Sequence, residues 1–220
     1  MQKNGGQVGA SPQPAPHSFA QPSTRVVLVT GAGRGIGRAI ATALGGRSAV
    51  VCVNDINPDS AAETVRAVEA AGGQGKTYLA DVSKKFPVQA MFNEIEDDWG
   101  RLDAVVHRAR VTPRKPLLEM DEWEWRRTLD VNLTGAFNIL QIAGRVMEAA
   151  GGGTIVLLVE TPDDPTHFGA VEAARRGVLG LAGAVEQELA EVGILLTAVV
   201  YQAGADVETV EKVIGAVFRA

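Results

Sequence analysis

The sequence predicts an α/β protein with a doubly wound parallel sheet. From Arg25 onwards, short apolar segments rich in β-branched residues alternate with helical segments of ten or more residues, and glycines separate many of them. Parallel strands need helical crossovers, which are right-handed and cover both faces of a sheet. Strands of such a sheet are buried on both sides, so they are almost continuously apolar.

The first half of the chain supplies three strand–helix units. Arg25–Thr30 (RVVLVT) is a β-branched run that ends at a glycine, which is typical of a buried parallel strand. The glycine pair Gly72-Gly73 ends the second helix. The predicted helices and the two further strands are Gly35–Leu44, Ala49–Asn54, Ser60–Ala71, Lys76–Ala80 and Pro87–Trp99.

The second half continues the alternation. A fourth strand is predicted over Leu102–His107, and helical spacing follows over Asp121–Ala149, with a break, until three glycines at 151–153 stop it. The remaining elements are a strand at Thr154–Val159 (TIVLLV), an Ala- and Gly-rich helix at Val171–Val192, a strand at Ile194–Tyr201 and a helix at Glu208–Phe218.

Composition bounds the class of protein. A chain of 220 residues with 46% hydrophobic and 21% charged residues is large enough for one domain, which we place at 25–220. Residues 1–24 are rich in Gly, Pro, Gln and Ser, so we expect a flexible N-terminal tail, with docking onto a partner as the alternative.

Charge and cysteine content exclude several functions. A net charge of −5 argues against nucleic acid and against an anionic membrane surface as partners. Cys52 is the single cysteine, so the sequence contains no intramolecular disulfide. We find no membrane-spanning run and no signal-peptide pattern, and we expect a cytoplasmic protein.

A glycine-rich segment, TGAGRGIG at 30–37, joins the first strand to the first helix. Gly31 permits a tight turn, Gly37 lets the helix pack closely on the sheet, and the helix N-terminus offers free N–H groups to a pyrophosphate. Asp55 ends the second strand, where a carboxylate accepts ribose hydroxyls and repels a 2′-phosphate, which favours NAD over NADP. Arg34 and Arg38 point the other way, towards NADP, because nearby guanidinium groups could bind its 2′-phosphate. The alternative to nucleotide binding is a glycine-rich turn that serves packing alone.

Several motifs together resemble the short-chain dehydrogenase/reductase family, specifically the branch around 3-oxoacyl-carrier-protein reductase. They are TGAGRGIG at 30–37, Asp55, Ala80-Asp81-Val82, Trp125, DVNLTG at 130–135 and GVLGL at 177–181. The resemblance implies that Asp81 and Val82 contact adenine and that Asn132 is the family's active-site asparagine. The cofactor-binding residues that it implies are Gly31, Arg34, Gly35, Ile36, Gly37, Asp55, Asp81, Val82 and Ala109.

The same resemblance shows where the family's catalytic residues should lie, and this chain departs from them. Val171 stands at the tyrosine position, Arg175 at the lysine position and Glu160 at the serine position. Valine has no proton to transfer, and a guanidinium does not replace an amine directly. The family's Asn-Asn-Ala-Gly turn reads HRAR at 107–110, with Arg110 in place of the glycine. Of the four catalytic positions, only Asn132 is retained, so we predict that the standard mechanism is absent.

Other polar residues near the same edge leave a different chemistry open. Glu160, His107 and His167 could supply acid–base groups, with Thr161 as the nearby hydroxyl, or they could be loop residues without a catalytic role. Asp163-Asp164 has no companion ligands at metal spacing, so we predict no metal site.

Beyond the sixth strand the resemblance weakens. Ala203-Gly204 is loosely similar to the family's Pro-Gly turn, and the substrate lid is short. The family's seventh strand has no counterpart, so we expect the sixth strand to be exposed unless another chain covers it.

The two long helices are expected to form an oligomer surface, because the family pairs them between subunits and because they keep small and apolar residues at 133–147 and 171–189. The favoured hypothesis is a catalytically degenerate subunit that pairs with an active family member, with a homo-oligomer as the other assembly. Whether it still binds NAD is open, because the glycine-rich turn and Asp55 favour binding whereas Arg110 and Arg175 oppose it. The partner would act on an acyl thioester or a similar carbonyl or hydroxyl compound. The alternatives are an NAD(P)-dependent oxidoreductase with non-standard catalytic residues, and an NAD-binding sensor without turnover.

Overall fold

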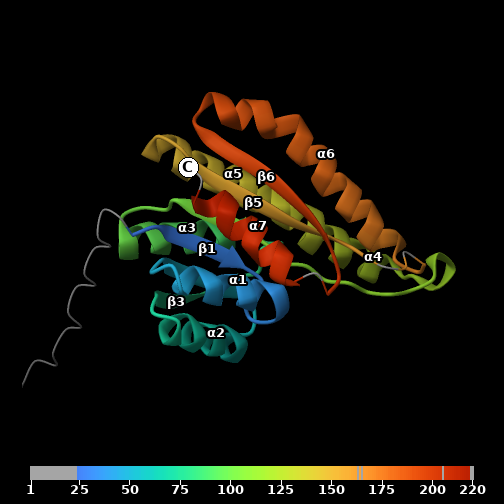
Figure 1. The fold of residues 1–220 in the computed structure, drawn as a ribbon. Coiled ribbons are helices and arrows are strands. Elements are labelled where there is room, and N and C mark those ends of the chain that lie inside the picture. The colour runs from blue at the N-terminus through green and yellow to red at the C-terminus, as the bar shows by residue number, and fades with distance from the viewer. Residues whose placement is uncertain (1–23, 163, 165, 205, 219–220) are drawn as a thin grey trace, which may run out of the picture.

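Residues 24–162, 164, 166–204 and 206–218 are described by the structure, a computed structural model of the chain. They form one six-stranded parallel sheet in the order β3-β2-β1-β4-β5-β6 (Figure 1). The predicted doubly wound α/β fold is therefore confirmed. The strands are β1 (Val26–Thr30), β2 (Val50–Asp55), β3 (Gln74–Leu79), β4 (Ala104–His107), β5 (Gly153–Thr161) and β6 (Ile194–Gln202).

Seven α-helices and two short turns of other helix types connect these strands in the described residues. The α-helices are α1 (Gly35–Gly45), α2 (Pro58–Ala70), α3 (Lys85–Trp99), α4 (Glu122–Leu129), α5 (Gly135–Ala150), α6 (Gly169–Glu191) and α7 (Asp206–Phe218). A 3₁₀ turn, η1 (Leu117–Glu119), lies in a segment where no element is predicted from the sequence. Most predicted boundaries agree with these within two residues.

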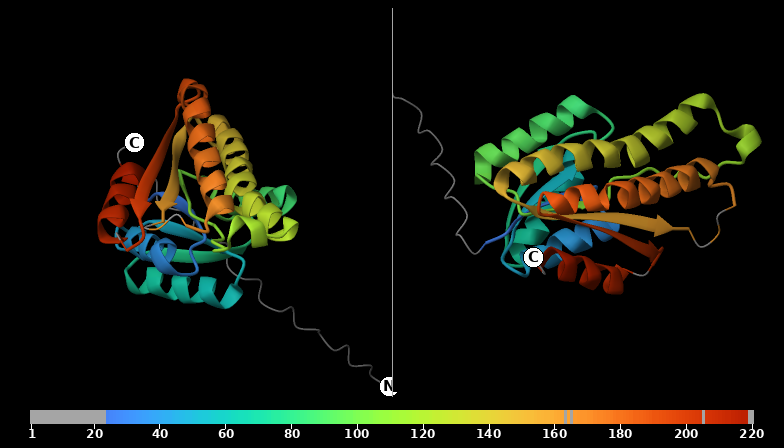
Figure 2. Two further views of the ribbon diagram at one scale, coloured as in Figure 1. Left: turned by 90° about the vertical axis from the view of Figure 1, so that its right-hand side faces the viewer. Right: turned by 90° about the horizontal axis from the view of Figure 1, so that it is seen from above.

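The helices cover the sheet on both faces, which gives three layers (Figure 2). Apolar side chains of α1, α2 and α7 pack on one face, around Val27, Val29 and Val106. Those of α3, α5 and α6 pack on the other, around Leu28, Val105 and Leu157. Successive residues of a strand thus point to opposite faces of the sheet, and both faces are covered by helices. This is why the strands are apolar throughout.

The expected break in the long helical segment is a π-helical turn at Asp130–Thr134, called η2, between α4 and α5. Gly151, with φ at 90°, ends α5 in the left-handed conformation. The expectation for the tail at 1–24 falls outside the described residues, except for Thr24. No helix in the described part of the chain is long and apolar enough to cross a bilayer.

The strand order reverses at β1, which lies between β2 and β4. Thr30, the last residue of β1, is level with Asn54 of β2 and His107 of β4. In open α/β sheets, ligands bind at the carboxyl ends of the strands at this reversal. The fold therefore places the loops after β1, β2, β4 and β5 at the same edge of the sheet.

Candidate functional site

The glycine-rich turn between β1 and α1 has the backbone that the sequence predicts. Gly31 and Gly35 have φ values of 62° and 54°, which L side chains rarely adopt. A Cβ on Gly31 would lie 2.8 Å from the Ala109 Cα, and one on Gly37 would overlap the Gly31 carbonyl oxygen. No side chain caps the N-terminus of α1, where Ile36 is buried. The first N–H groups of α1 therefore suit an anion.

Asp55 closes one side of this turn. Its Oδ2 accepts a hydrogen bond from the Gly33 N–H at 2.9 Å, and its Oδ1 accepts one from the Asn57 N–H at 3.0 Å. The carboxylate is half-buried at the end of β2, where the sequence places the ribose acceptor. These bonds fix the orientation of Asp55, because both oxygens are anchored to backbone.

Of the two arginines beside the turn, Arg38 is bonded within the protein and Arg34 is exposed. The Arg38 guanidinium donates to the Gly33 carbonyl and to Thr64 Oγ1, and it pairs with Glu63 at 2.8 Å. Arg34 is exposed at the N-cap of α1. Arg38 is therefore a structural clamp on the turn, whereas Arg34 is accessible to solvent.

The loop after β3 carries the residues expected to contact adenine. Asp81 accepts hydrogen bonds from the N–H and hydroxyl of Ser83 and lies 3.3 Å from an Arg127 nitrogen. Val82 is buried, and its carbonyl accepts a hydrogen bond from Asn138 of α5. Burial opposes ionisation of Asp81, but the Ser83 and Arg127 contacts outweigh it and lower its pKa. An ionised acceptor therefore stands beside an apolar side chain.

Thr30 and His107 lock the ends of β1 and β4 together. Thr30 Oγ1 accepts hydrogen bonds from the N–H groups of Arg108 and Ala109, at 3.1 and 3.3 Å. Its own hydrogen is therefore donated to His107 Nδ1, 2.8 Å away, which leaves the His107 proton on Nε2. Burial, with a smaller contribution from Arg108, lowers the pKa of His107 to about 4. His107 is thus neutral at pH 7.

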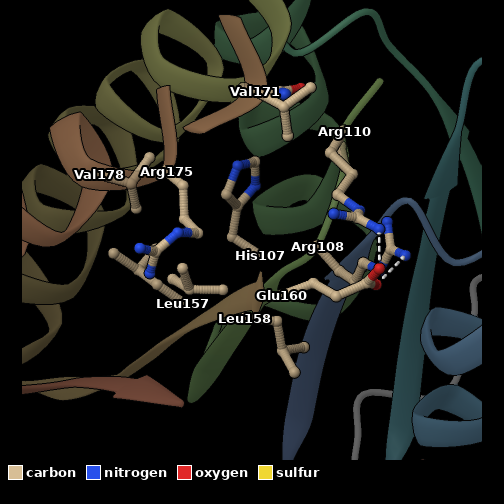
Figure 3. A pocket seen from close by; sticks show the side chains of 12 residues that line it. His107, Arg108, Arg110, Leu157, Leu158, Glu160, Val171, Arg175 and Val178 are labelled. Atoms are coloured by element: carbon tan, nitrogen blue, oxygen red, sulfur yellow. Dashed lines mark hydrogen bonds and ion pairs between the residues drawn. The ribbon is translucent and has the colours of Figure 1, made fainter. Parts of the chain in front are cut away.

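A small pocket lies where the carboxyl ends of β4 and β5 face α6. Its volume is about 50 Å³, well below the roughly 300–1,000 Å³ of common small-molecule sites. The positions singled out in the sequence converge on this pocket (Figure 3). Its lining includes His107, Arg110, Asn132, Glu160, Val171 and Arg175.

Glu160 is held from three sides at one wall of this pocket. Arg110 forms an ion pair with Glu160 Oε1, and Arg108 approaches Oε2 at 3.4 Å (Figure 3). The Tyr201 hydroxyl donates a hydrogen bond to the same Oε2 at 2.8 Å. The charged side chains are each about four-fifths buried, at 15–20% exposure. We call these four residues the arginine–glutamate cluster.

Val171 and Arg175 lie on the first two turns of α6. Val171 is buried and presents only methyl groups to the pocket. The Arg175 guanidinium donates to both carboxylate oxygens of Glu172, at 2.6 and 2.8 Å. This pairing, helped by Arg176, lowers the pKa of Glu172 to about 2. The α6 side of the pocket therefore offers a saturated ion pair and an apolar wall.

Asn132 in the π-turn is engaged by backbone on both sides of its amide. Its Oδ1 accepts from the Val111 N–H and its Nδ2 donates to the Val111 carbonyl, both at 2.8 Å. These two hydrogen bonds fix the loop that follows β4, so Asn132 has a structural role in this site.

The other polar candidates lie outside the pocket. His167 is exposed, and its carbonyl accepts from the Lys115 N–H. Thr161 ends β5 level with Gln202 and lines a separate hollow. Asp164 pairs with Arg114, and Asp163 lies outside the described residues. Within the part of the chain that the structure describes, no group of three metal-ligating side chains occurs.

Two members of the cluster were not identified from the sequence. The sequence motifs include Arg108 only as part of the altered HRAR turn, and they place Tyr201 only at the end of a predicted strand. Tyr201 is one of only two tyrosines, and it sits at the carboxyl end of β6, the edge where ligands bind. That position was the available signal, although nothing local indicated its contact with Glu160.

Comparison with known proteins gives one consistent family. A family model described as short chain dehydrogenase matches residues 25–211. The 3-oxoacyl-(acyl-carrier-protein) reductase FabG of Staphylococcus aureus is 37% identical over 180 residues, which cover 80% of this chain and 73% of that protein. A 3beta-hydroxysteroid dehydrogenase of Mediterraneibacter gnavus is 33% identical over 190 residues, covering 86% and 68%.

Solved structures agree. A metagenomic short-chain oxidoreductase in complex with NADP superposes with a TM-score of 0.82 at 28% identity, covering 89% of this chain and 92% of that one. A putative short-chain alcohol dehydrogenase from Sinorhizobium meliloti gives a TM-score of 0.77 at 32% identity, with 81% and 71% covered.

Proposed function

Because the chain belongs to the short-chain dehydrogenase family, which comprises NAD(P)-dependent oxidoreductases, we propose that it binds the adenosine diphosphate part of a nucleotide but lacks the family's tyrosine-dependent hydride transfer. The observation that carries this proposal is the arginine–glutamate cluster, whose charged side chains line the same small pocket as Val171. The two halves of a dinucleotide site therefore differ in this chain: glycines keep side chains away from the first, whereas charged side chains line the second.

The adenosine diphosphate half of the site fits a nucleotide. Glycines stand where a Cβ would collide with the backbone of Gly31 or Ala109, and the N-terminus of α1 carries no side-chain cap. Asp55, oriented by the Gly33 and Asn57 N–H groups, would accept the ribose hydroxyls. Since Arg38 is committed to Glu63, a 2′-phosphate would meet Asp55, which supports NAD over NADP.

The nicotinamide half does not fit. A bound nicotinamide supplies a hydride donor or acceptor, and the protein must supply a proton donor beside the reacting carbonyl. The pKa of His107, which lines the pocket, is lowered to about 4, and burial raises the pKa of Tyr201, which contacts the pocket residue Glu160, to about 12. Neither is poised near pH 7, and Val171 cannot transfer a proton.

The proposal is tested by restoring the family's residues. The quadruple variant Val171→Tyr, Arg175→Lys, Glu160→Ser and Arg110→Gly is expected to gain NAD(P)H-dependent reduction of a simple β-keto thioester, with wild type at the level of the buffer blank. The matched control carries Phe instead of Tyr at Val171, which fills the same space without a proton. Turnover by the wild-type chain would contradict the proposal.

A second candidate is an oxidoreductase with non-standard catalytic residues, which the comparisons favour because the relatives are named as reductases and dehydrogenases. In this chain it is supported by the Tyr201 hydroxyl, which bonds to Glu160 at the pocket. If a substrate is turned over by wild type, Tyr201→Phe should lower kcat at least about 100-fold. An unchanged kcat would exclude Tyr201 as the proton donor.

The same arrangement supports a role as a non-catalytic partner. We propose that α5 and α6 pair with the corresponding helices of an active family member, whose own site supplies the chemistry. An NAD-binding sensor without turnover is the remaining alternative, and it requires a homo-oligomer or monomer that binds nucleotide tightly.

A further inference from the structure

The arginine–glutamate cluster is not balanced in charge. Arg108 and Arg110 each carry a positive charge, and Glu160 supplies one negative charge between them. Tyr201 is neutral, because burial raises its pKa and the carboxylate accepts its hydrogen bond. His107, on the same pocket wall, is also neutral. One positive charge at this wall of the pocket therefore has no counter-charge within the cluster.

Arg108 also has an unused donor. Its Nε is buried and has no hydrogen-bond partner in the structure, although its Nη2 approaches Glu160. A buried donor without a partner costs free energy that a ligand oxygen would recover. Burial lowers the pKa of the Arg110 guanidinium, and the neighbouring positive charge of Arg108 lowers it further, despite the opposing effect of Glu160.

The cluster adjoins the glycine-rich turn. The Ala109 and Arg108 backbones lie within van der Waals reach of Gly31, and both of their N–H groups bond to Thr30 at the end of β1. A nucleotide that places its phosphates on the N-terminus of α1 would therefore direct its next group towards the two arginines.

From this excess charge and its location we infer that the arginine–glutamate cluster is an oxyanion site, and that the preferred ligand is an adenine nucleotide with a further phosphate in place of nicotinamide. This inference rests on the proposed nucleotide binding at the Gly31–Gly37 turn. Two guanidinium groups recognise phosphate oxygens by charge-assisted hydrogen bonds. Oxidised nicotinamide is itself a cation, so a net positive pocket of about 50 Å³ disfavours it by both charge and size.

The test compares ADP, ATP and NAD⁺ by calorimetry, without divalent cations, on the full chain. ATP is expected to bind about tenfold more tightly than ADP, and NAD⁺ more weakly than ADP. In Arg110→Gln and in Arg108→Gln, the advantage of ATP over ADP should disappear while ADP binding remains. The matched control is Arg126→Ala, which removes an exposed arginine of α4 and should leave the ratio unchanged.

Adding free phosphate shows whether the cluster binds a phosphate that is part of the nucleotide or a separate phosphate ion. If ATP and ADP bind equally but phosphate strengthens ADP binding through Arg110, the cluster is an oxyanion site for a free ion. If neither effect is seen, the inference is wrong. If no nucleotide binds at all, the proposed function fails. In that case, thermal protection by phosphate that requires Arg110 would support the oxyanion site alone, and protection independent of Arg110 would overturn it.

Discussion

The hydrogen-bond partners of single side chains limit the chemistry that is available at the carboxyl edge of the sheet. Asn132 has the residue type of a catalytic position, yet both ends of its amide are engaged by Val111. Glu160 is an acid at the edge of a pocket, yet it is held by Arg108, Arg110 and Tyr201. In each case the chemistry open to the residue depends on its hydrogen-bond partners, because a donor or acceptor that is already satisfied gains little from a ligand.

His107 makes a pH-dependent contribution to stability. Its pKa is about 4 in the folded protein, against roughly 6.5 in an unfolded chain. The folded state therefore favours the neutral ring, so stability is full above pH 6.5 and is lost as the pH falls towards 4. We expect the unfolding free energy to drop by up to about 3 kcal/mol over this range.

Urea unfolding at several pH values measures this slope. His107→Gln should flatten it between pH 6.5 and 4, since the amide does not titrate. His167→Gln is the control, because that side chain is exposed. Equal slopes for wild type and His107→Gln would show that another group is responsible.

Asp55 is expected to favour a ribose with a free 2′-hydroxyl over one with a 2′-phosphate. Asp55→Asn should weaken ADP binding about tenfold, because a charged acceptor of the ribose hydroxyls is lost. The same change should reduce the discrimination against 2′-phospho-ADP, since the repelling charge is removed. Titration of both nucleotides measures the ratio, and Asp59→Asn, at an exposed position in the first turn of α2, is the matched control. An unchanged ratio would exclude Asp55 as the selecting group.

At the scale of elements, the β1–α1 unit depends on close approach of backbone to backbone. Gly37 lies in the first turn of α1 directly above the Gly31 carbonyl, and Gly33 is in contact with Asp55. The turn is thus built by glycines that allow the helix to begin at the end of the strand, with its N–H groups directed at the crevice.

Gly37→Ala should therefore destabilise the whole unit. The added methyl group would overlap the Gly31 carbonyl oxygen, and overpacking of this kind costs about 2–3 kcal/mol. Gly169→Ala at the start of α6, where nothing lies within 4 Å of the added Cβ, is expected to change stability by less than about 0.5 kcal/mol. Chemical unfolding of both variants checks the difference, and equal stabilities would contradict the packing role assigned to Gly37.

At the scale of the whole molecule, α5 and α6 lie side by side on one face of the sheet (Figures 1 and 2). Their outer surface has small or apolar residues: Gly180, Gly183 and Ala184 are exposed on α6, and Phe137 is 42% exposed on α5. Small residues allow another helix to approach closely, which suits the proposed pairing with a second family subunit.

Gly183→Glu tests this surface without disturbing the fold, because nothing lies within 4 Å of the added Cβ. A native mass spectrum of wild type purified from its own host should show a hetero-oligomer with a longer family member. The variant should release that partner and keep its stability within about 0.5 kcal/mol of wild type. Gly169→Glu should leave the assembly intact. A wild-type monomer or homo-oligomer would contradict the partner hypothesis.

The sequence by itself determined the strands, the helices and the glycine-rich turn, because these depend on local patterns. Buried parallel strands must be apolar, and a strand-to-helix turn around a phosphate must be glycine-rich. It also located Val171, Arg175 and Glu160, since their positions follow from fixed spacings to the neighbouring motifs. The break in the long helical segment was expected, but its form as a π-turn was not.

Only the tertiary structure decided how those residues act. Glu160 is about fifty residues from Arg108 and Arg110 and about forty from Tyr201, and neighbouring parallel strands bring them together. Thr30 and His107 are 77 residues apart in the sequence and meet at the ends of β1 and β4, where burial lowers the pKa of the histidine. Charge balance, burial and unsatisfied donors are properties of side chains that meet across strands, so local patterns could not show that these residues come together at the pocket.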